Sequence, residues 1–314
     1  MTKAFTSLDD WRQDGHYFAH RGQRVFYKHA QAGTKPTLLL IHGFPTSSWD
    51  WSLLWKHLAL HFNLIALDMI GYGFSAKPID YVYSVFDQAD LCESLLKRLH
   101  ISQFHLLTHD VGDTVAQELL ARQYDTSADA NAANSAQPKL LSLCLLNGGL
   151  FPETHRPLLV ERLLLSPLGA LIAKRIKRAN FQKNMCAIFG LNTPPTKREI
   201  DVMWALINEN NGLIVMPALI GYIRERQRNR ARWVGALVHA GGDSIHRPIP
   251  VRLIVGEADP ISGRHMTSRY RALVAAADIM LLNGIGHYPQ IEAPDMVLKG
   301  YLDFMHTVQP LARA

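Results

Sequence analysis

The stretch Phe-His-Leu-Leu-Thr-His-Asp-Val-Gly-Asp, residues 104–113, decides the fold of this 314-residue chain. Its apolar beginning predicts a buried strand, and a helical pattern over residues 114–123 follows it. Between the two, His109-Asp110-Val111-Gly112 fits the sharp strand-to-helix turn that raises one side chain above a parallel sheet. Such a turn usually presents serine, whereas here it presents Asp110. The turn therefore predicts an α/β fold with a carboxylate at its reactive position.

A carboxylate at this position favours one kind of chemistry. It can attack a saturated carbon and displace a leaving group, which leaves an alkyl ester on the protein. Attack on an acyl carbonyl would instead give a mixed anhydride, so Asp110 makes ordinary ester and amide hydrolysis the less natural reaction.

The composition is that of an ordinary globular protein, with 48% hydrophobic and 19% charged residues. No apolar run approaches the roughly 20 residues that span a bilayer, and the first ten residues lack the apolar stretch of a secretory signal. Cys92, Cys144 and Cys186 are widely spaced, which predicts buried free thiols in a reducing compartment. We therefore expect a cytoplasmic protein. The histidines and cysteines show no metal-ligand spacing, so neither metal nor cofactor is expected.

The positive charge is concentrated in one part of the chain. Residues 151–250 hold 15 Lys and Arg against seven acidic residues, a net +8, while the whole chain carries +6. A solvated basic face is the favoured interpretation, and attraction of anionic substrates, lipid or nucleic acid is the alternative. No nucleic-acid-binding module is evident, so we expect no nucleic-acid partner. Contact of this basic segment with a membrane surface is the less favoured alternative, and both a monomer and a homodimer remain open.

Short apolar runs alternate with helical patterns, which predicts a doubly wound, mostly parallel α/β sheet. An early hairpin over residues 17–28 adds two strands to six others, for eight in all. The six are predicted at Thr37–Ile41, Leu64–Leu67, Phe104–Leu107, Leu141–Leu146, Val251–Val255 and Ile279–Leu282. Helices are predicted at Trp49–Leu60, Val85–Leu99 and Thr114–Gln123, with a final helix that begins near Pro294.

Two segments interrupt this alternation. Residues 125–138 are polar and rich in Ala, Asn and Ser, which predicts an exposed loop. Residues 151–247 hold Leu- and Ile-rich helical patterns broken by prolines, without a strand pattern. We expect this second segment to be a helical cap inserted into the sheet domain, with residues 1–150 and 248–314 forming the two parts of the α/β core.

Two backbone amides are candidates for an oxyanion hole. His42-Gly43-Phe44-Pro45 directly follows the predicted strand at residues 37–41, and Val111 follows Asp110. The amides of Phe44 and Val111 could therefore point at the same place. They would stabilise the tetrahedral oxyanion that forms when water attacks an ester carbonyl of Asp110.

The remaining catalytic candidates follow the last two predicted strands. Asp259 comes after the strand at residues 251–255 and is expected to orient an imidazole, with Glu257 as its rival. His287 lies in the Gly-rich loop after the strand at residues 279–282. Because the nucleophile is a carboxylate, His287 would activate the water that cleaves the ester. The order nucleophile, acid, base along the chain fits this assignment.

These motifs resemble the α/β-hydrolase superfamily over nearly the full length, specifically its epoxide hydrolase and haloalkane dehalogenase branch. The resemblance is carried by residues 42–45, Asp68-Met69-Ile70-Gly71-Tyr72-Gly73-Phe74-Ser75, residues 109–113 and Gly286-His287. Residues 147–157, 232–237 and 287–290 are similar to segments of the mesoderm-specific transcript protein group. The resemblance implies the α/β-hydrolase fold with an inserted helical cap.

Departures from the branch pattern bear on the substrate. The resembling haloalkane dehalogenases place a halide-binding Trp after the nucleophile and an Asn after the His-Gly pair, where this chain has Val111 and Phe44. Neither side chain offers a donor to a halide. Epoxide hydrolases use two cap tyrosines, whereas Tyr222 is the only tyrosine in residues 151–250. A second donor could come from His155, Trp204 or Tyr288, or be absent.

The sequence thus favours a hydrolase that opens an epoxide in a small apolar substrate through an ester on Asp110. The alternatives are carbon–halogen hydrolysis with an unusual halide site, and a member of the fold that binds without catalysis. His109 is expected to pack or hydrogen-bond beneath the turn. Asp113 is expected to interact as a charge with the N-terminus of the helix.

Overall fold

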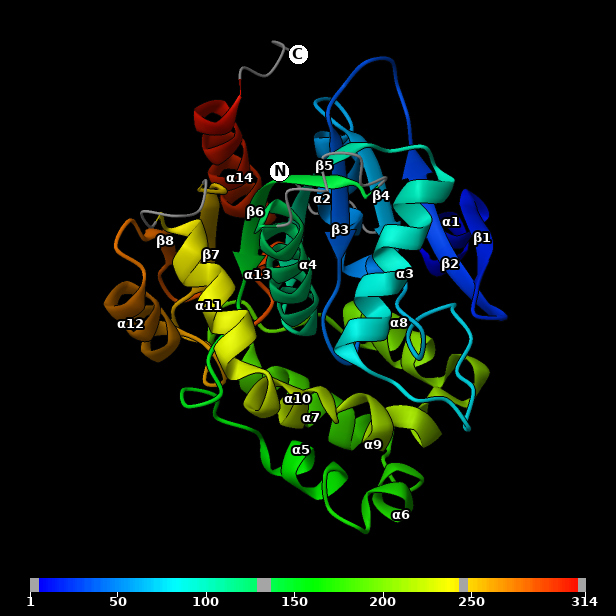
Figure 1. Ribbon diagram of the computed structural model, residues 1–314. Coiled ribbons are helices and arrows are strands. Elements are labelled where there is room, and N and C mark those ends of the chain that lie inside the picture. The colour runs from blue at the N-terminus through cyan, green and yellow to red at the C-terminus, as the bar shows by residue number, and fades with distance from the viewer. Residues whose placement is uncertain (1–5, 129–136, 243–247, 310–314) are drawn as a thin grey trace.

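A sheet of eight strands forms the centre of the computed structural model, which describes residues 6–128, 137–242 and 248–309 (Figure 1). The strand order is β1-β2-β4-β3-β5-β6-β7-β8. Strand β2 runs antiparallel to β1 and β4, and all other pairs are parallel. The strands are β1 Gly15–His20, β2 Gln23–Ala30, β3 Thr37–Ile41, β4 Asn63–Leu67, β5 Gln103–His109, β6 Lys139–Leu146, β7 Val251–Gly256 and β8 Asp278–Leu282. The predicted doubly wound, mostly parallel sheet is confirmed.

Helices cover both faces of the sheet, which explains why β3 and β4 are buried at every residue. Figure 1 shows α3, α4 and α11 in front of the sheet, while α2 and α14 contact each other on the other face. None of the described helices is both long and apolar enough to cross a bilayer. The helices outside the insertion are α1 Leu8–Gln13, η1 Ser48–Trp51, α2 Ser52–Leu58, α3 Val85–Arg98, α4 Val111–Ala128, α12 Arg264–Leu273, α13 Pro289–Glu292 and α14 Pro294–Val308.

The predicted loop at residues 125–138 is wrong in its first part, because α4 continues to Ala128. The Thr126 hydroxyl donates to the Arg122 carbonyl at 2.6 Å, and Asp125 forms an ion pair with Arg232 at 2.8 Å. These contacts extend the helix through a polar sequence. Residues 129–136, the centre of the predicted loop, lie outside the described residues.

The chain between β6 and β7 is helical, as predicted for the insertion. Figure 1 places α5 to α10 below the sheet, whereas α11 packs against α4. The predicted cap, residues 151–247, therefore includes a helix that packs on the core, and its last five residues lie outside the described ranges. The domain limits remain a prediction. The helices are α5 Leu159–Leu164, α6 Gly169–Ala173, α7 Arg178–Ile188, α8 Lys197–Asn208, η3 Glu209–Val215, α9 Met216–Leu219, α10 Tyr222–Arg228 and α11 Arg230–Ala240.

The cysteines differ in part from expectation. All three are free thiols, as predicted, and Cys92 and Cys144 are buried. Cys186 is exposed, because it lies on the outer side of α7 while Met185 faces the interior.

One buried carboxylate joins α11 to α4. Glu118 on α4 is 1% exposed and accepts hydrogen bonds from Arg122 on its own helix. It also accepts from Arg232 Nε and Trp233 Nε1 on α11, each at 2.8 Å. Three donors on one buried carboxylate compensate its desolvation. Glu118 therefore holds the last helix of the insertion against the sheet domain.

Replacing Glu118 by Leu should lower the free energy of unfolding by about 3 kcal/mol, since the Trp233 indole loses its acceptor and the Arg122 and Arg232 guanidinium groups each lose one of theirs. Urea denaturation would measure the change. Lys299→Ala serves as the control, because it removes an exposed ion pair with Asp303 and should change stability by about 0.5 kcal/mol or less. Equal effects of the two substitutions would contradict this role for Glu118.

Candidate active site

The turn between β5 and α4 places Asp110 directly after the C-terminal end of β5, a central strand of the sheet. Asp110 has φ = +48°, a left-handed conformation that costs free energy in a residue other than glycine. The neighbouring backbone leaves no room for larger residues: a Cβ on Gly112 would lie 2.6 Å from the Ile41 carbonyl oxygen, and one on Gly43 would lie 2.9 Å from Asp110 Cβ. The two glycines therefore permit the turn that the sequence motif predicts.

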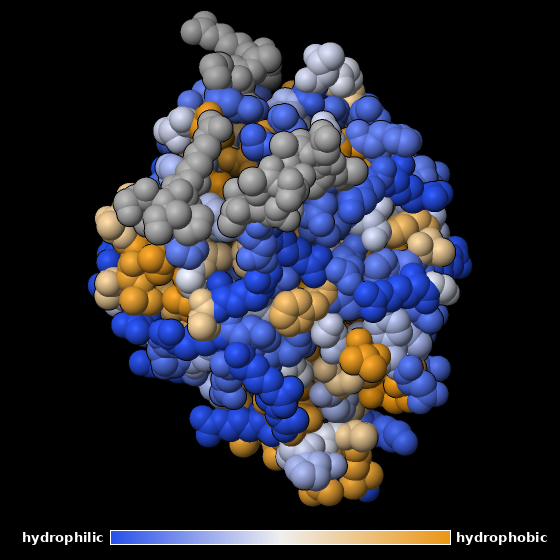
Figure 2. All heavy atoms as spheres, viewed as in Figure 1, coloured by the Kyte–Doolittle hydropathy of each residue, from blue (hydrophilic) through white to orange (hydrophobic). Residues whose placement is uncertain are grey.

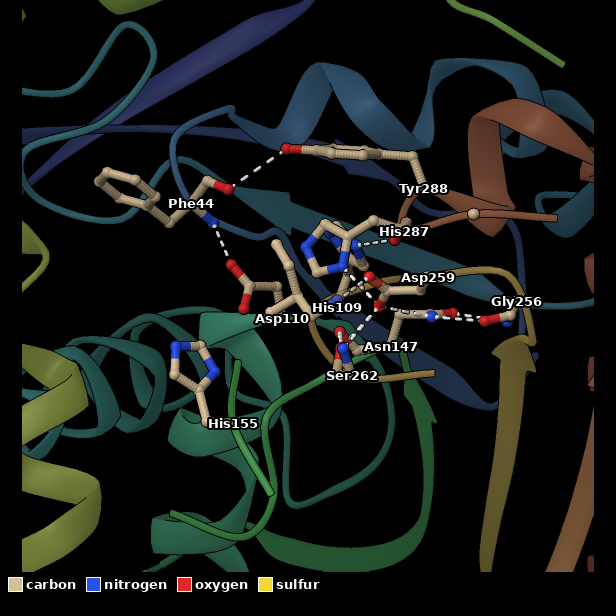
Figure 3. Close-up of polar contacts among 12 residues, drawn as sticks. Phe44, His109, Asp110, Asn147, His155, Gly256, Asp259, Ser262, His287 and Tyr288 are labelled. Carbon is tan, nitrogen blue, oxygen red and sulfur yellow. Dashed lines mark hydrogen bonds and ion pairs between the residues drawn. The ribbon is translucent and has the colours of Figure 1, made fainter. Parts of the chain in front are cut away.

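The backbone amide of Phe44 lies beside the carboxylate of Asp110. It donates to Asp110 Oδ2 at 3.0 Å (Figure 3). The Tyr288 hydroxyl donates to the carbonyl oxygen of Phe44 at 3.2 Å, so this buried tyrosine supports the Phe44 turn. Val111 is the first residue of α4, directly after Asp110. An oxyanion hole formed by the Phe44 and Val111 amides remains a prediction.

Asp259 and His287 form a buried pair. Asp259 Oδ2 and His287 Nδ1 are 2.8 Å apart (Figure 3). The same carboxylate accepts from Asn147 Nδ2 at 2.9 Å and from the Ser262 hydroxyl at 2.8 Å. Its rival Glu257 instead forms an ion pair with Arg264. Of the two acids that follow β7, Asp259 is therefore the one that holds the imidazole.

The electrostatics of this pair favour its charged form. Burial opposes charge on both groups, but the charge of His287 and hydrogen bonds from His287 and Asn147 lower the pKa of Asp259 to about 2. The charge and hydrogen bond of Asp259, together with the charges of Asp110 and Glu161, outweigh burial and raise the pKa of His287 to about 9. Loss of negative charge from Asp110 would therefore lower the pKa of His287.

The loop that carries His287 is tied to the insertion. The His287 amide donates to the carbonyl oxygen of Ile188 at the end of α7. Glu292 Oε2 accepts from the amides of Gly190 and Gly286 at 2.7 and 2.8 Å. His109 Nε2 lies 2.8 Å from the His287 carbonyl oxygen, as a hydrogen bond beneath the turn requires. The imidazole position thus depends on where the insertion packs.

Asp110 and His287 face one cavity between the sheet and the insertion. The cavity wall is apolar apart from a few groups, among which Glu161 on α5 is the third that can ionise. The apolar part of the wall is formed by Phe44, Pro45, Leu158, Val160, Leu164, Ile176, Phe181, Met185, Ile188, Met216 and Ile261. A wall of this kind suits an apolar substrate held near a few polar groups.

Glu161 is a buried carboxyl group that the sequence analysis did not single out. Its Oε2 accepts the Leu158 amide at 2.7 Å, and its side chain is 8% exposed. Burial, reinforced by the charge of Asp110, raises the pKa of Glu161 to about 7. Two carboxyl groups therefore face the same cavity, and Glu161 holds its proton up to near neutral pH.

Arg226 on α10 places a buried positive charge beside Asp110. Its side chain is 2% exposed, and Nε donates to the Thr114 hydroxyl at 2.6 Å. Nη2 donates to the Asp110 carbonyl oxygen at 3.3 Å and lies 3.7 Å from Asp110 Oδ1. Sequence reasoning counted Arg226 only as part of the basic segment. Arg226 follows Tyr222 by four residues, one helical turn. This spacing was the sequence signal that could have placed Arg226 near the predicted site.

The four predicted substrate-binding residues lie around this cavity and are not among its lining residues. Tyr222 is buried and lines an adjoining cavity with Val111, beneath the Arg226 guanidinium at 4.7 Å. Trp204 packs against Phe181, with ring centroids 5.7 Å apart. His155 Nε2 lies 3.9 Å from Glu161 Oε2, and Tyr288 supports Phe44 as described. Their contact with substrate remains a prediction.

Burial opposes the predicted charge interaction of Asp113 with the helix N-terminus, which remains a prediction. Asp113 is fully buried, and Thr108 donates to its Oδ1 at 2.6 Å. Burial raises the pKa of Asp113 well above its usual value, and the charge of Asp110 adds to this effect. Burial beneath the turn thus opposes the charged form of Asp113, against the favourable field of the helix N-terminus.

Over residues 6–128, 137–242 and 248–309, no group of three or more His, Cys, Asp or Glu side chains is arranged to hold a metal ion.

Comparison with known proteins agrees with this geometry. Residues 36–294 match the family model of the alpha/beta hydrolase fold. The mesoderm-specific transcript protein of Mus musculus is 39% identical over 310 residues, covering 96% of this chain and 88% of that protein. A haloalkane dehalogenase DbeA loop variant from Bradyrhizobium elkanii superposes with a TM-score of 0.74 at 21% identity, covering 94% and 96% of the two chains. The epoxide hydrolase CorEH superposes with a TM-score of 0.72 at 18% identity, covering 94% and 99%. This chain belongs to the α/β-hydrolase fold family.

Proposed function

We propose that this protein is a hydrolase that opens an epoxide to a diol through a covalent alkyl ester on Asp110. The observation that carries the proposal is the arrangement of three ionisable groups, Asp110, Glu161 and His287, around one apolar cavity. Their environments suit three different tasks, which are nucleophile, acid and base.

In the first step, Asp110 attacks one epoxide carbon and the bond from that carbon to the epoxide oxygen breaks. The electron pair stays on the oxygen, which takes the proton of Glu161 and becomes a hydroxyl group. The raised pKa of Glu161 keeps this proton available near pH 7. An alkoxide is a poor leaving group, so a proton donor is the feature that epoxide opening requires.

In the second step, His287 takes a proton from water, and the resulting hydroxide attacks the ester carbonyl of Asp110. The Phe44 amide, 3.0 Å from Asp110 Oδ2, supports the assignment of an oxyanion hole at this carbonyl. The bond to the alkyl oxygen then breaks, and that oxygen takes the proton from His287. The new Asp110 carboxyl group returns its proton to Glu161, which restores the starting state.

Ester formation also prepares the base. The charge of Asp110 is one of the causes that raise the pKa of His287. An ester at Asp110 carries no charge, but proton donation leaves Glu161 negative, and that charge also raises the pKa of His287. Because Asp110 is the larger of these two causes, the pKa of His287 still falls as the intermediate forms, by less than the loss of the Asp110 charge alone would give. The imidazole then loses its proton to solvent and acts on water, while Asp259 keeps it oriented at 2.8 Å. It regains a proton from solvent once Asp110 is a charged carboxylate again.

Carbon–halogen hydrolysis is the second candidate for the same nucleophile. A departing halide needs donors that remain in place and takes no proton. Val111 and Phe44 offer no side-chain donor, whereas a protonated Glu161 suits an oxygen leaving group. A binding protein without catalysis has no need of the buried Asp259–His287 pair or of Arg226 beside Asp110. The protonated Glu161 therefore favours an epoxide over a halide, and the buried contacts favour catalysis over binding alone.

The covalent step can be tested with His287→Gln, which removes the base and should trap the ester. Intact-protein mass spectrometry after exposure to styrene oxide should show an added mass equal to the whole epoxide. A haloalkane substrate would instead add the alkyl group alone, because the halide leaves. Asp110→Asn in the same background is the control and should show no adduct.

In the unmodified protein, a single turnover in ¹⁸O-labelled water should place the label in the Asp110 carboxylate. Label that enters the diol directly, without passing through Asp110, would overturn the covalent mechanism.

The proton donor can be tested with Glu161→Gln, combined with His287→Gln so that ester formation is followed alone. The amide can accept the Leu158 hydrogen bond but cannot supply a proton, so ester formation should slow by about 10²- to 10⁴-fold. With Glu161 present, the rate should fall as the pH rises through the pKa of Glu161, because Glu161 loses its proton. In the His287→Gln background this fall should come above pH 7, since the charge of His287, which lowers the pKa of Glu161, is gone. Glu161→Gln should remove this dependence. The control is Glu153→Gln, which changes a surface carboxylate paired with Arg230.

An unchanged pH profile in Glu161→Gln would show that another group protonates the epoxide oxygen.

A further inference from the structure

The first two helices of the insertion expose large apolar side chains to solvent. Leu159 and Leu163 on α5 are 72% and 41% exposed, and Leu168 and Leu171, at α6, are 63% and 48% exposed. Four of the nine large hydrophobic residues that are exposed in the described ranges therefore lie within 13 residues. Figure 2 shows hydrophobic residues at the lower end of the molecule, where Figure 1 places α6. We call these four residues the leucine face.

Four exposed positive charges lie between or directly after the residues of the leucine face in the sequence. Arg162, Lys174, Arg175 and Lys177 are exposed, and within the part of the chain described here none of them forms an ion pair. The only acidic residue between positions 158 and 177 is Glu161, whose side chain is buried toward the cavity. The solvent side of α5 and α6 thus combines leucines with unpaired cations and carries no exposed carboxylate.

We propose that the leucine face and its four cations bind the protein to the surface of an anionic lipid bilayer. Leucine side chains can enter the boundary between headgroups and acyl chains, to a depth of about 5–10 Å. Lysine and arginine side chains around them can reach the lipid phosphates, and their long apolar stems allow this without burial of charge. The combination is that of an interfacial amphipathic surface.

The charge distribution argues against a second copy of this chain as the occupant. Two leucine faces in contact would bring together eight exposed cations from residues 162, 174, 175 and 177 of each copy, without a carboxylate from the same face to neutralise them. Exposed leucines alone would be compatible with a dimer. Leucines surrounded by charges of one sign fit a surface of the opposite sign better.

The same helices have their other side in the candidate active site. Leu158, Glu161 and Leu164, on or next to α5, line the cavity with Asp110, and so does Ile176 after α6. A protein bound through the leucine face would hold this wall of the cavity against the lipid. If the proposed function holds, its substrate is therefore an epoxide that partitions into the bilayer. This consequence rests on the proposed function, whereas the docking itself does not.

Vesicle flotation with the full-length protein tests the docking. Vesicles of mixed phosphatidylserine and phosphatidylcholine should carry the protein, and vesicles of phosphatidylcholine alone should carry much less. Lys174→Gln with Arg175→Gln should reduce partitioning onto the anionic vesicles by about 25-fold, or about fivefold per charge. Leu168→Ser with Leu171→Ser should reduce it by about tenfold or more.

The matched control is Leu60→Ser, which changes a leucine that is 57% exposed elsewhere on the molecule and should leave partitioning unchanged. All the substituted side chains are exposed, and unchanged thermal unfolding would verify the fold. Equal binding to neutral and anionic vesicles, or equal loss in the control, would overturn the proposal. So would a dimer in sedimentation analysis that the leucine substitutions dissociate in the absence of any vesicle binding.

Different results would contradict the membrane-docking proposal and the proposed function. Vesicle binding without an ester on Asp110 would leave the docking in place and remove the proposed function. With both present, Leu168→Ser/Leu171→Ser should slow turnover of an epoxide dissolved in anionic vesicles and leave turnover of a water-soluble epoxide unchanged. These residues lie outside the cavity wall, so their loss does not alter the site directly.

Discussion

The close approach of two backbone turns beneath Asp110 is the constraint on which the site depends. Gly43 and Gly112 allow the turn after β3 to pack directly against the turn after β5. Asp110, in the second turn, takes a left-handed conformation. The strain is held by the hydrogen bonds of a buried parallel sheet on one side and by an 18-residue helix on the other. Only in that position does the carboxylate meet both the Phe44 amide and the cavity.

Burial then gives neighbouring carboxyl groups different properties. Asp259 receives hydrogen bonds from Asn147, Ser262 and His287, and its pKa falls. Asp113 receives one from Thr108 and Glu161 one from a backbone amide, and the pKa of each rises. The charged form is therefore favoured at Asp259 and the protonated form at Asp113 and Glu161, because the number and charge of the hydrogen-bond donors decide which form is stable.

The insertion takes part in the site from two sides. Its α7 end holds the His287 loop through the Ile188 carbonyl oxygen, and Arg226 from α10 reaches the turn at Asp110. Meanwhile α5 carries Glu161 inward and two residues of the leucine face, Leu159 and Leu163, outward. A displacement of the insertion would therefore alter the positions of His287, Arg226 and Glu161 together. This coupling explains how an outer surface could influence chemistry in the cavity.

The sequence by itself determined the sheet and the turn at Asp110, and it brought His287 and the two acids after β7 to one end of the sheet, because local periodicity and turn chemistry specify strand ends, and parallel strands bring their ends together. It did not determine which of Asp259 and Glu257 holds His287, the length of α4, the raised pKa of Asp113, or the positions of Asn147, Glu161 and Arg226. Tertiary structure alone decided these, since they depend on burial and on contacts between residues far apart in the chain, such as Arg226 and Thr114. Charge and hydropathy along a sequence do not reveal which side of a short helix faces a cavity.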